Sequence, residues 1–66
     1  YILGDAQDYA DWQPDTVYAA RTFAVNNSNL YEVVTAGTSD SSGGPAGTGT
    51  AITDGTVTWC WRRVVE

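Results

Sequence analysis

The sequence predicts an all-β domain, a small single-layer antiparallel sheet of three to four strands with a long Gly/Ser/Thr loop. Three observations lead to this fold class. Short segments alternate polar side chains with apolar, β-branched or aromatic ones, which is the period-two pattern of strands. Clusters of turn-forming residues separate these segments. No stretch indicates a stable helix of the usual amphipathic kind.

The strongest strand signal lies near the end of the chain. Asp54-Gly55 predicts a turn, and in the segment after it Val57, Trp59 and Trp61 fall on one face of a strand. Two indoles on one face form the largest apolar patch that so small a chain offers. They therefore either build the core or contact a partner.

A hairpin is predicted in the middle of the chain. Residues 21–25 alternate polar and apolar side chains, residues 26–29 are four turn formers in a row, and residues 30–35 are rich in β-branched and aromatic side chains. Residues 36–50 carry five of the seven glycines and no large apolar side chain, so we expect them to form the long loop.

Residues 1–11 are interpreted as an N-terminal extension or linker, and residues 12–66 as the β module. Asp5, Asp8 and Asp11 would place like charges on neighbouring helical turns, which disfavours a helix. The same aspartates lack the ligand spacing and final glutamate of a calcium loop, so no metal is expected. Because the chain contains no methionine, we expect it to be a segment of a longer or processed protein.

Size and charge narrow the possible partners. With 66 residues, a single cysteine and no histidine, the chain has neither an internal disulfide nor a zinc site to support a thin core, so we expect oligomerisation or attachment to a larger polypeptide. The net charge of -5 argues against nucleic acid and anionic lipid. No apolar run approaches the roughly 20 residues that span a bilayer, so no membrane insertion is expected.

The residue inventory argues against an enzyme. No histidine or lysine is present to activate a serine or Cys60, and a carboxylate pair of the glycosidase type needs a cleft that a thin sheet does not form. No cofactor motif is found.

The aromatic residues are the remaining candidates for function. Exposed rings stack on the apolar faces of sugars or anchor protein contacts. The candidate contacts with a glycan or partner are Trp12, Tyr18 and Trp61. The candidate core residues are Phe23, Tyr31, Val33, Val57 and Trp59. Tyr18 fits the core as well, because a small domain must build its interior from the large side chains it has.

Four segments in order carry a resemblance to a known type of module: 12–18 with Trp12, Pro14 and Tyr18, the hairpin end 29–33, the loop opening 36–39, and the final strand 54–59. Together they resemble a small β module of tailed-phage virion proteins and, more distantly, the chitin-binding modules of secreted chitinases. The chain departs from that pattern at Arg21 and Ser28, where the resemblance leads one to expect glycine.

The resemblance implies a structural or attachment module of a virion, in a tail fibre, tail spike, head fibre or decoration protein. It also implies contacts with other virion proteins and a homo-oligomer, with a trimer favoured. The alternative is a carbohydrate-binding module that contacts host glycan or a chitin-like polysaccharide through Trp12, Tyr18 and Trp61.

Overall fold

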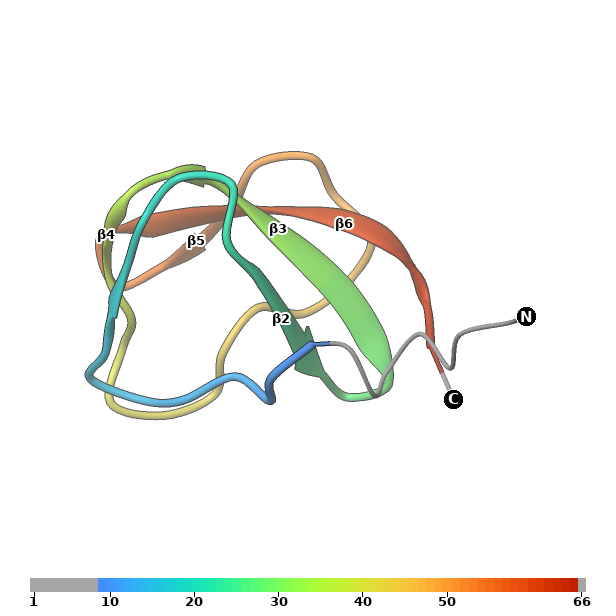
Figure 1. The fold of residues 1–66 in the computed structure, drawn as a ribbon, viewed down its shortest axis with the longest axis horizontal. Coiled ribbons are helices and arrows are strands. Elements are labelled where there is room, and N and C mark those ends of the chain that lie inside the picture. The colour runs from blue at the N-terminus through green and yellow to red at the C-terminus, as the bar shows by residue number, and fades with distance from the viewer. Residues whose placement is uncertain (1–8, 66) are drawn as a thin grey trace.

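The computed structural model describes residues 9–65, and this part of the chain forms six strands and no helix (Figure 1). The strands are β1 (Val17–Tyr18), β2 (Phe23–Asn26), β3 (Asn29–Thr35), β4 (Gly37–Thr38), β5 (Ile52–Asp54) and β6 (Val57–Val64). They form an antiparallel four-stranded sheet of order β2-β3-β6-β5 and a separate two-stranded ribbon of β1 and β4. The all-β prediction is confirmed, and the ribbon is an addition to it.

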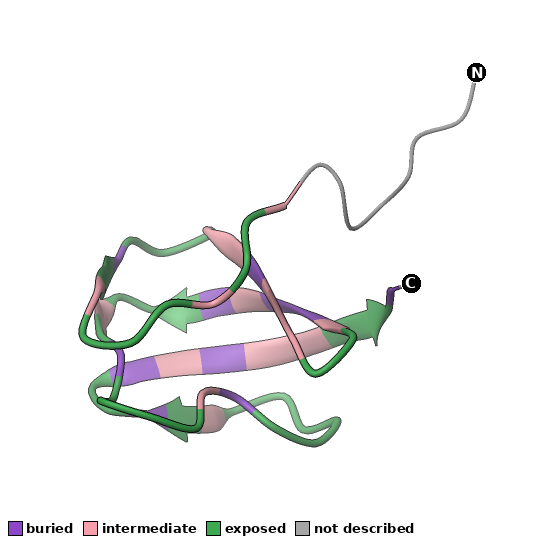
Figure 2. Cartoon of the chain, turned by 90° about the horizontal axis from the view of Figure 1, so that it is seen from below, coloured by how far each residue is buried: buried purple, intermediate pink, exposed green. Residues whose placement is uncertain are grey.

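The two long strands β3 and β6 form the centre of the larger sheet. Two cross-strand rows set the register: Ala24 faces Tyr31, which faces Trp61, and Val33 faces Trp59. Side chains in one row share a face of the sheet, so these residues all lie on the same side. Burial alternates over the first half of β6, where Val57 and Trp59 are buried and the residues that follow each of them are half-buried (Figure 2).

The buried cluster lies on this face, which is called the core face below. Its members are Tyr18, Ala24, Tyr31, Val33, Val57 and Trp59, with Trp12, Ile52 and Trp61 packed against it. The rings of Tyr18 and Trp59 meet edge to face with centroids 5.0 Å apart. Of the expected core residues, Tyr31, Val33, Val57 and Trp59 are buried here.

Phe23 is the expected core residue that the structure places elsewhere. It is half-buried and lies in the row with Glu32 and Cys60, on the opposite face of the sheet. The ring of Tyr9 packs on it with centroids 5.2 Å apart. The reason is register: the alternation along β2 gives the core face to the smaller Ala24.

The chain between β4 and β5, residues 39–51, covers the core face without forming a strand. Pro45, a member of this segment, is fully buried. The Tyr31 hydroxyl donates to the Gly47 carbonyl at 2.8 Å, and the Asn26 amide donates to the Pro45 carbonyl at 2.8 Å. The loop is therefore held by side chains of the sheet, since it contributes little apolar surface of its own.

The N-terminal boundary of the module falls inside a hydrogen-bonded segment. The Val25 amide donates to the Ala10 carbonyl at 3.0 Å, and the Trp12 amide donates to the Val25 carbonyl at 2.9 Å. Ala10–Trp12 thus runs parallel to β2 and covers part of its edge. Within residues 9–65 no helix has the length and apolar character needed to cross a membrane.

Candidate functional site

The face of the sheet opposite the core face carries half-buried and exposed side chains in the middle of the β3–β6 pair. Its central row consists of Phe23, Glu32 and Cys60. Among residues 9–65, the one ring contact with this row is that of Tyr9 with Phe23. We call the set Arg21, Glu32, Val34, Cys60 and Arg62 the open strip.

Two irregularities in the β3–β6 ladder lie beside the open strip. At the first, Tyr31 faces Trp61 but Leu30 faces Arg63, so Arg62 has no partner in the ladder. At the second, Val33 faces Trp59 but Thr35 faces Thr58, so Val34 has no partner in the ladder. Such β-bulges re-aim side chains and occur often beside functional surfaces. Val34 is 54% exposed, a large value for an aliphatic side chain near the middle of a domain.

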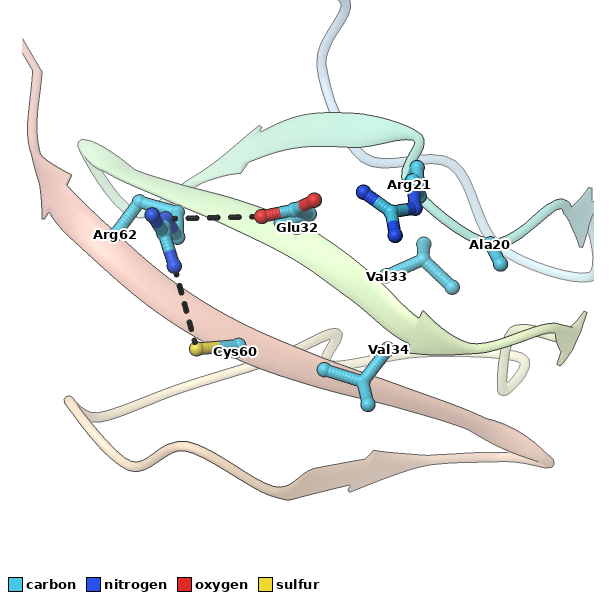
Figure 3. Close-up of a pocket in the computed structure, with 7 residues that line it drawn as sticks. All are labelled: Ala20, Arg21, Glu32, Val33, Val34, Cys60 and Arg62. Atoms are coloured by element: carbon cyan, nitrogen blue, oxygen red, sulfur yellow. Dashed lines mark hydrogen bonds and ion pairs between the residues drawn. The ribbon is translucent and has the colours of Figure 1, made fainter.

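The open strip borders a shallow hollow of about 300 Å³ (Figure 3). Its lining residues are Ala20, Arg21, Glu32, Val33, Val34, Cys60 and Arg62. Both unpaired residues of the two bulges are among them. The hollow thus combines an exposed aliphatic side chain with two guanidinium groups and one carboxylate.

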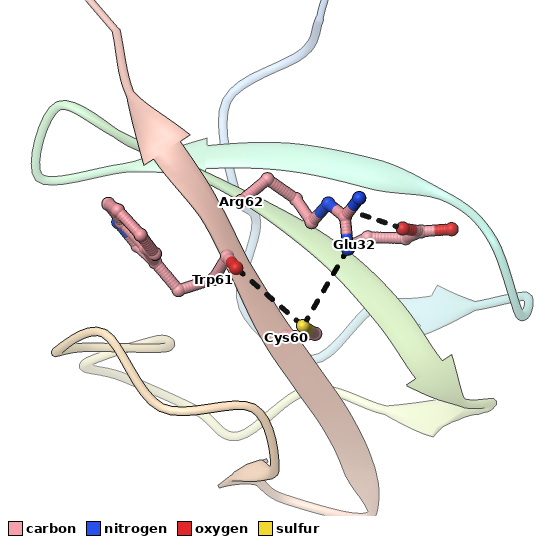
Figure 4. Close-up of polar contacts among 4 residues, drawn as sticks. All are labelled: Glu32, Cys60, Trp61 and Arg62. Carbon is pink, nitrogen blue, oxygen red and sulfur yellow. Dashed lines mark hydrogen bonds and ion pairs between the residues drawn. The ribbon is translucent and has the colours of Figure 1, made fainter.

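The polar groups of the open strip are only loosely joined (Figure 4). Arg62 Nε lies 3.7 Å from Glu32 Oε1, and Arg62 Nη1 lies 4.0 Å from the Cys60 sulfur. The Arg62 side chain is 51% exposed and that of Glu32 is 23% exposed, so we expect this long ion pair to contribute about 0–1 kcal/mol and to be screened by salt. Arg62 and Glu32 therefore remain free to exchange partners when another surface approaches.

Trp61 points away from this group, toward the core face (Figure 4). Its indole N–H donates to Asn29 Oδ1 at 3.0 Å, and the ring is half-buried against the core of its own chain. The sequence predicts Trp61 as a candidate contact with a glycan or partner. The structure packs its ring against the core of the chain.

Tyr18 and Trp12 are also tied into the module. Tyr18 is only 8% exposed, and its hydroxyl accepts a hydrogen bond from the Gln13 amide at 2.8 Å. Trp12 is half-buried and donates its indole N–H to Asp54. None of the three candidate contact residues Trp12, Tyr18 and Trp61 is an exposed residue, so they do not form an open stacking platform.

Asp54 joins two of the tryptophans. One carboxylate oxygen accepts from Trp12 Nε1 at 2.7 Å and from Trp59 Nε1 at 3.0 Å, while the other accepts from the Asp40 amide at 3.1 Å. The residue is 4% exposed. Sequence reasoning assigned Asp54 to a turn alone, because nothing in a linear pattern pairs it with an indole 42 residues away.

A second hollow, of about 360 Å³, lies at the edge of β2 beside the Trp12 ring. Its lining residues are Asp11, Trp12, Val25, Asn26, Asn27, Ser28 and Val65. Its lining combines one aromatic residue, Trp12, with residues that carry amide and carboxylate groups.

Within the part of the chain that the structure describes, no group of three or more His, Cys, Asp or Glu side chains is placed to hold a metal ion. Asp5 and Asp8, two of the three aspartates considered for calcium, lie outside the described residues. Comparison of the sequence with known protein families and with curated proteins gives no match.

Proposed function

We propose that the chain is a structural or attachment module of a tailed-phage virion, held in place by protein–protein contacts and without a catalytic role. The observation that carries the contact role is the open strip. A sheet covered on one face, with exposed aliphatic and charged side chains over a shallow hollow on the other, is suited to pack against another protein surface.

The assignment to a virion rests on the sequence resemblance, and two backbone angles support that resemblance. Arg21 has φ of 71° and Ser28 has φ of 63°. Both are positions where the resembled module is expected to have glycine, the residue that adopts positive φ without steric cost. Positive φ at these two positions agrees with the glycines that the resemblance leads one to expect, and this agreement supports the proposal.

The test is the protein composition of purified particles of the phage that encodes the chain. Mass spectrometry should detect its peptides at a fixed ratio to the major capsid or tail protein through successive density gradients. A chain that is made during infection but does not co-purify with particles would overturn the virion assignment.

A carbohydrate-binding module is the second candidate, favoured by the hollow beside Trp12. The arrangement differs from the expected platform, because Tyr18 is buried and Trp61 faces the core. Asp11, Asn27 and the Trp12 ring supply the mixture of polar groups and aromatic surface that sugars require.

Glycan binding is tested by retention on immobilised polysaccharides, with Asp11→Ala and Asn27→Gly as the informative variants. Both residues are exposed, so these changes should leave the fold intact. Retention of the wild type that both variants lose would favour the glycan role. Trp12→Ala is less informative, because it also removes a hydrogen bond to Asp54.

A further inference from the structure

The charged groups of this acidic protein are unevenly distributed over its surface. The chain has only three basic residues and a net charge of -5, yet Arg21 and Arg62 both line the hollow of the open strip. Glu32 is the one acidic residue there and already faces Arg62. The open strip is therefore locally basic, with the exposed Val34 among its charges.

Acidic side chains and another exposed valine lie together at the turn before β1. The Asp15 amide donates to the Asp40 carbonyl at 3.0 Å, so two exposed aspartates lie on adjacent segments. Val17, which follows two residues after Asp15, is 79% exposed. We call Asp15, Val17 and Asp40 the acidic corner.

We infer that the open strip binds the acidic corner of a second copy of this chain, in a head-to-tail contact. The contact would set Arg21 and Arg62 against Asp15 and Asp40, and Val34 against Val17. This inference rests on the proposed contact role and names its partner.

Charge favours the head-to-tail arrangement over a symmetric one. A two-fold contact of the open strip with itself would bring four guanidinium groups together with only two carboxylates. A head-to-tail contact instead joins opposite charges and offsets the repulsion between two acidic chains. Because its two surfaces differ, such a contact generates a ring where the rotation closes.

The test is sedimentation equilibrium of the intact chain across a wide concentration range, with two surface variants. The first variant combines Arg21→Glu with Arg62→Glu. The second combines Asp15→Asn with Asp40→Lys, since Asn tolerates the positive φ of 50° at position 15. The wild type should associate, and more weakly as salt is raised.

Each variant alone should associate at least roughly tenfold more weakly than the wild type. The second variant separates surface pairing from net charge, because it makes the chain less acidic and repulsion alone would then predict tighter association. An equimolar mixture of the two should form heterodimers, since each variant keeps one native surface.

The reactivity of Cys60, the single cysteine, provides an independent footprint of the open strip. Its labelling by a maleimide should slow as the wild type associates and stay fast in both variants. Circular dichroism checks that each variant is folded. If the first variant is not folded, the test is repeated with Arg21→Gln and Arg62→Gln combined. If the second is not folded, it is repeated with Asp15→Asn and Asp40→Asn combined.

Three results would overturn the inference. A wild type that stays monomeric at every concentration excludes self-contact. Unchanged association of the second variant excludes the acidic corner, and unchanged association of the first excludes the open strip. None of these results affects the proposed virion role, because the chain could still be found in particles, bound there to a different protein.

Discussion

The buried carboxylate of Asp54 connects three segments of the chain at the core. Its carboxylate accepts from two indole N–H groups and one backbone amide, and these donors come from three separate segments of the chain. A buried donor that loses its acceptor costs about 1–3 kcal/mol, whereas a satisfied one adds little. The arrangement is therefore much more sensitive to mutation than a surface turn would be.

Asp54→Asn is expected to lower the free energy of unfolding by about 1–3 kcal/mol, because an amide presents one acceptor atom where three donors converge. Urea denaturation followed by tryptophan fluorescence measures the change. Asp11→Asn is the matched control: it is the same substitution at an exposed site and should stay within about 0.5 kcal/mol of the wild type. Equal effects of the two variants would contradict the role of Asp54.

Tyr31 gives the fold a dependence on alkaline pH. Burial raises the pKa of its hydroxyl above the ordinary value of about 10, against a smaller opposing effect of a hydrogen bond with Asn29. Above that pH the unfolded chain loses the proton while the folded chain retains it, so stability should fall as pH rises past about 10.

The corresponding measurement is the free energy of unfolding at several values between pH 8 and pH 11. Tyr31→Phe should be less stable than the wild type at pH 8, because Gly47 loses the hydrogen bond to its carbonyl, and its stability should fall less steeply above pH 10. The same slope in both proteins would mean that other groups cause the alkaline loss.

At the residue scale, sequence reasoning succeeded where alternation decided burial and failed where distant segments meet. Trp59 and Val57 are buried because every second residue of β6 faces the core. The same rule cannot tell which of Phe23 and Ala24 points inward, since that depends on the register between β2 and β3. The Asp54 contacts depend on the path of the whole chain.

At the scale of elements, the turn of the β2–β3 hairpin requires positive φ at both of its loop residues. Asn27 and Ser28 form its two-residue loop with φ of 52° and 63°, the pattern of a type I′ turn. The run of turn formers predicted this hairpin correctly. The bulges at Val34 and Arg62 were not predicted, because an extra residue in a ladder leaves no pattern in a single sequence.

Ser28→Gly is expected to raise the free energy of unfolding by about 0.5–1 kcal/mol. A non-glycine residue in this backbone region costs about 1–2 kcal/mol, and the greater freedom of glycine in the unfolded chain offsets part of the gain. For a domain of this size, the melting temperature should rise by a few degrees. Asn27→Gly is the control, and its gain in stability should be smaller because Asn tolerates this conformation. If Ser28→Gly does not raise the free energy of unfolding, the backbone strain assigned to Ser28 is contradicted.

At the scale of the whole molecule, two parts of the chain cover the core face of the four-stranded sheet. One is the β1–β4 ribbon, which contributes Tyr18 to the core cluster, and the other is the loop of residues 39–51, which is hydrogen-bonded to Tyr31. Figure 2 shows buried positions along β3 and β6 and further ones in the neighbouring strands and connecting segments, with exposed chain between them. Glycine permits the loop to lie this close: a Cβ on Gly44 would lie 2.7 Å from the Asn26 amide nitrogen and 2.9 Å from the Trp12 ring. The loop is therefore part of the cover of the core face, together with the β1–β4 ribbon.

Two neighbouring glycines test whether the loop supports global stability. Gly43 and Gly44 both have positive φ, of 93° and 78°, so alanine brings a backbone cost at either position. A Cβ on Gly43 meets nothing within 4 Å, whereas one on Gly44 displaces Asn26 or Trp12. Gly44→Ala should therefore reduce the free energy of unfolding by about 1–3 kcal/mol more than Gly43→Ala does.

Denaturant unfolding of the two variants, read by both circular dichroism and tryptophan fluorescence, measures that difference. If the sheet depends on the loop as part of its cover, the two signals should change together in Gly44→Ala, because losing the cover unfolds the sheet as well. A Gly44→Ala protein that matches Gly43→Ala in stability would show that the sheet stands without its loop. In that case the core face, and not only the open strip, would require cover from another protein.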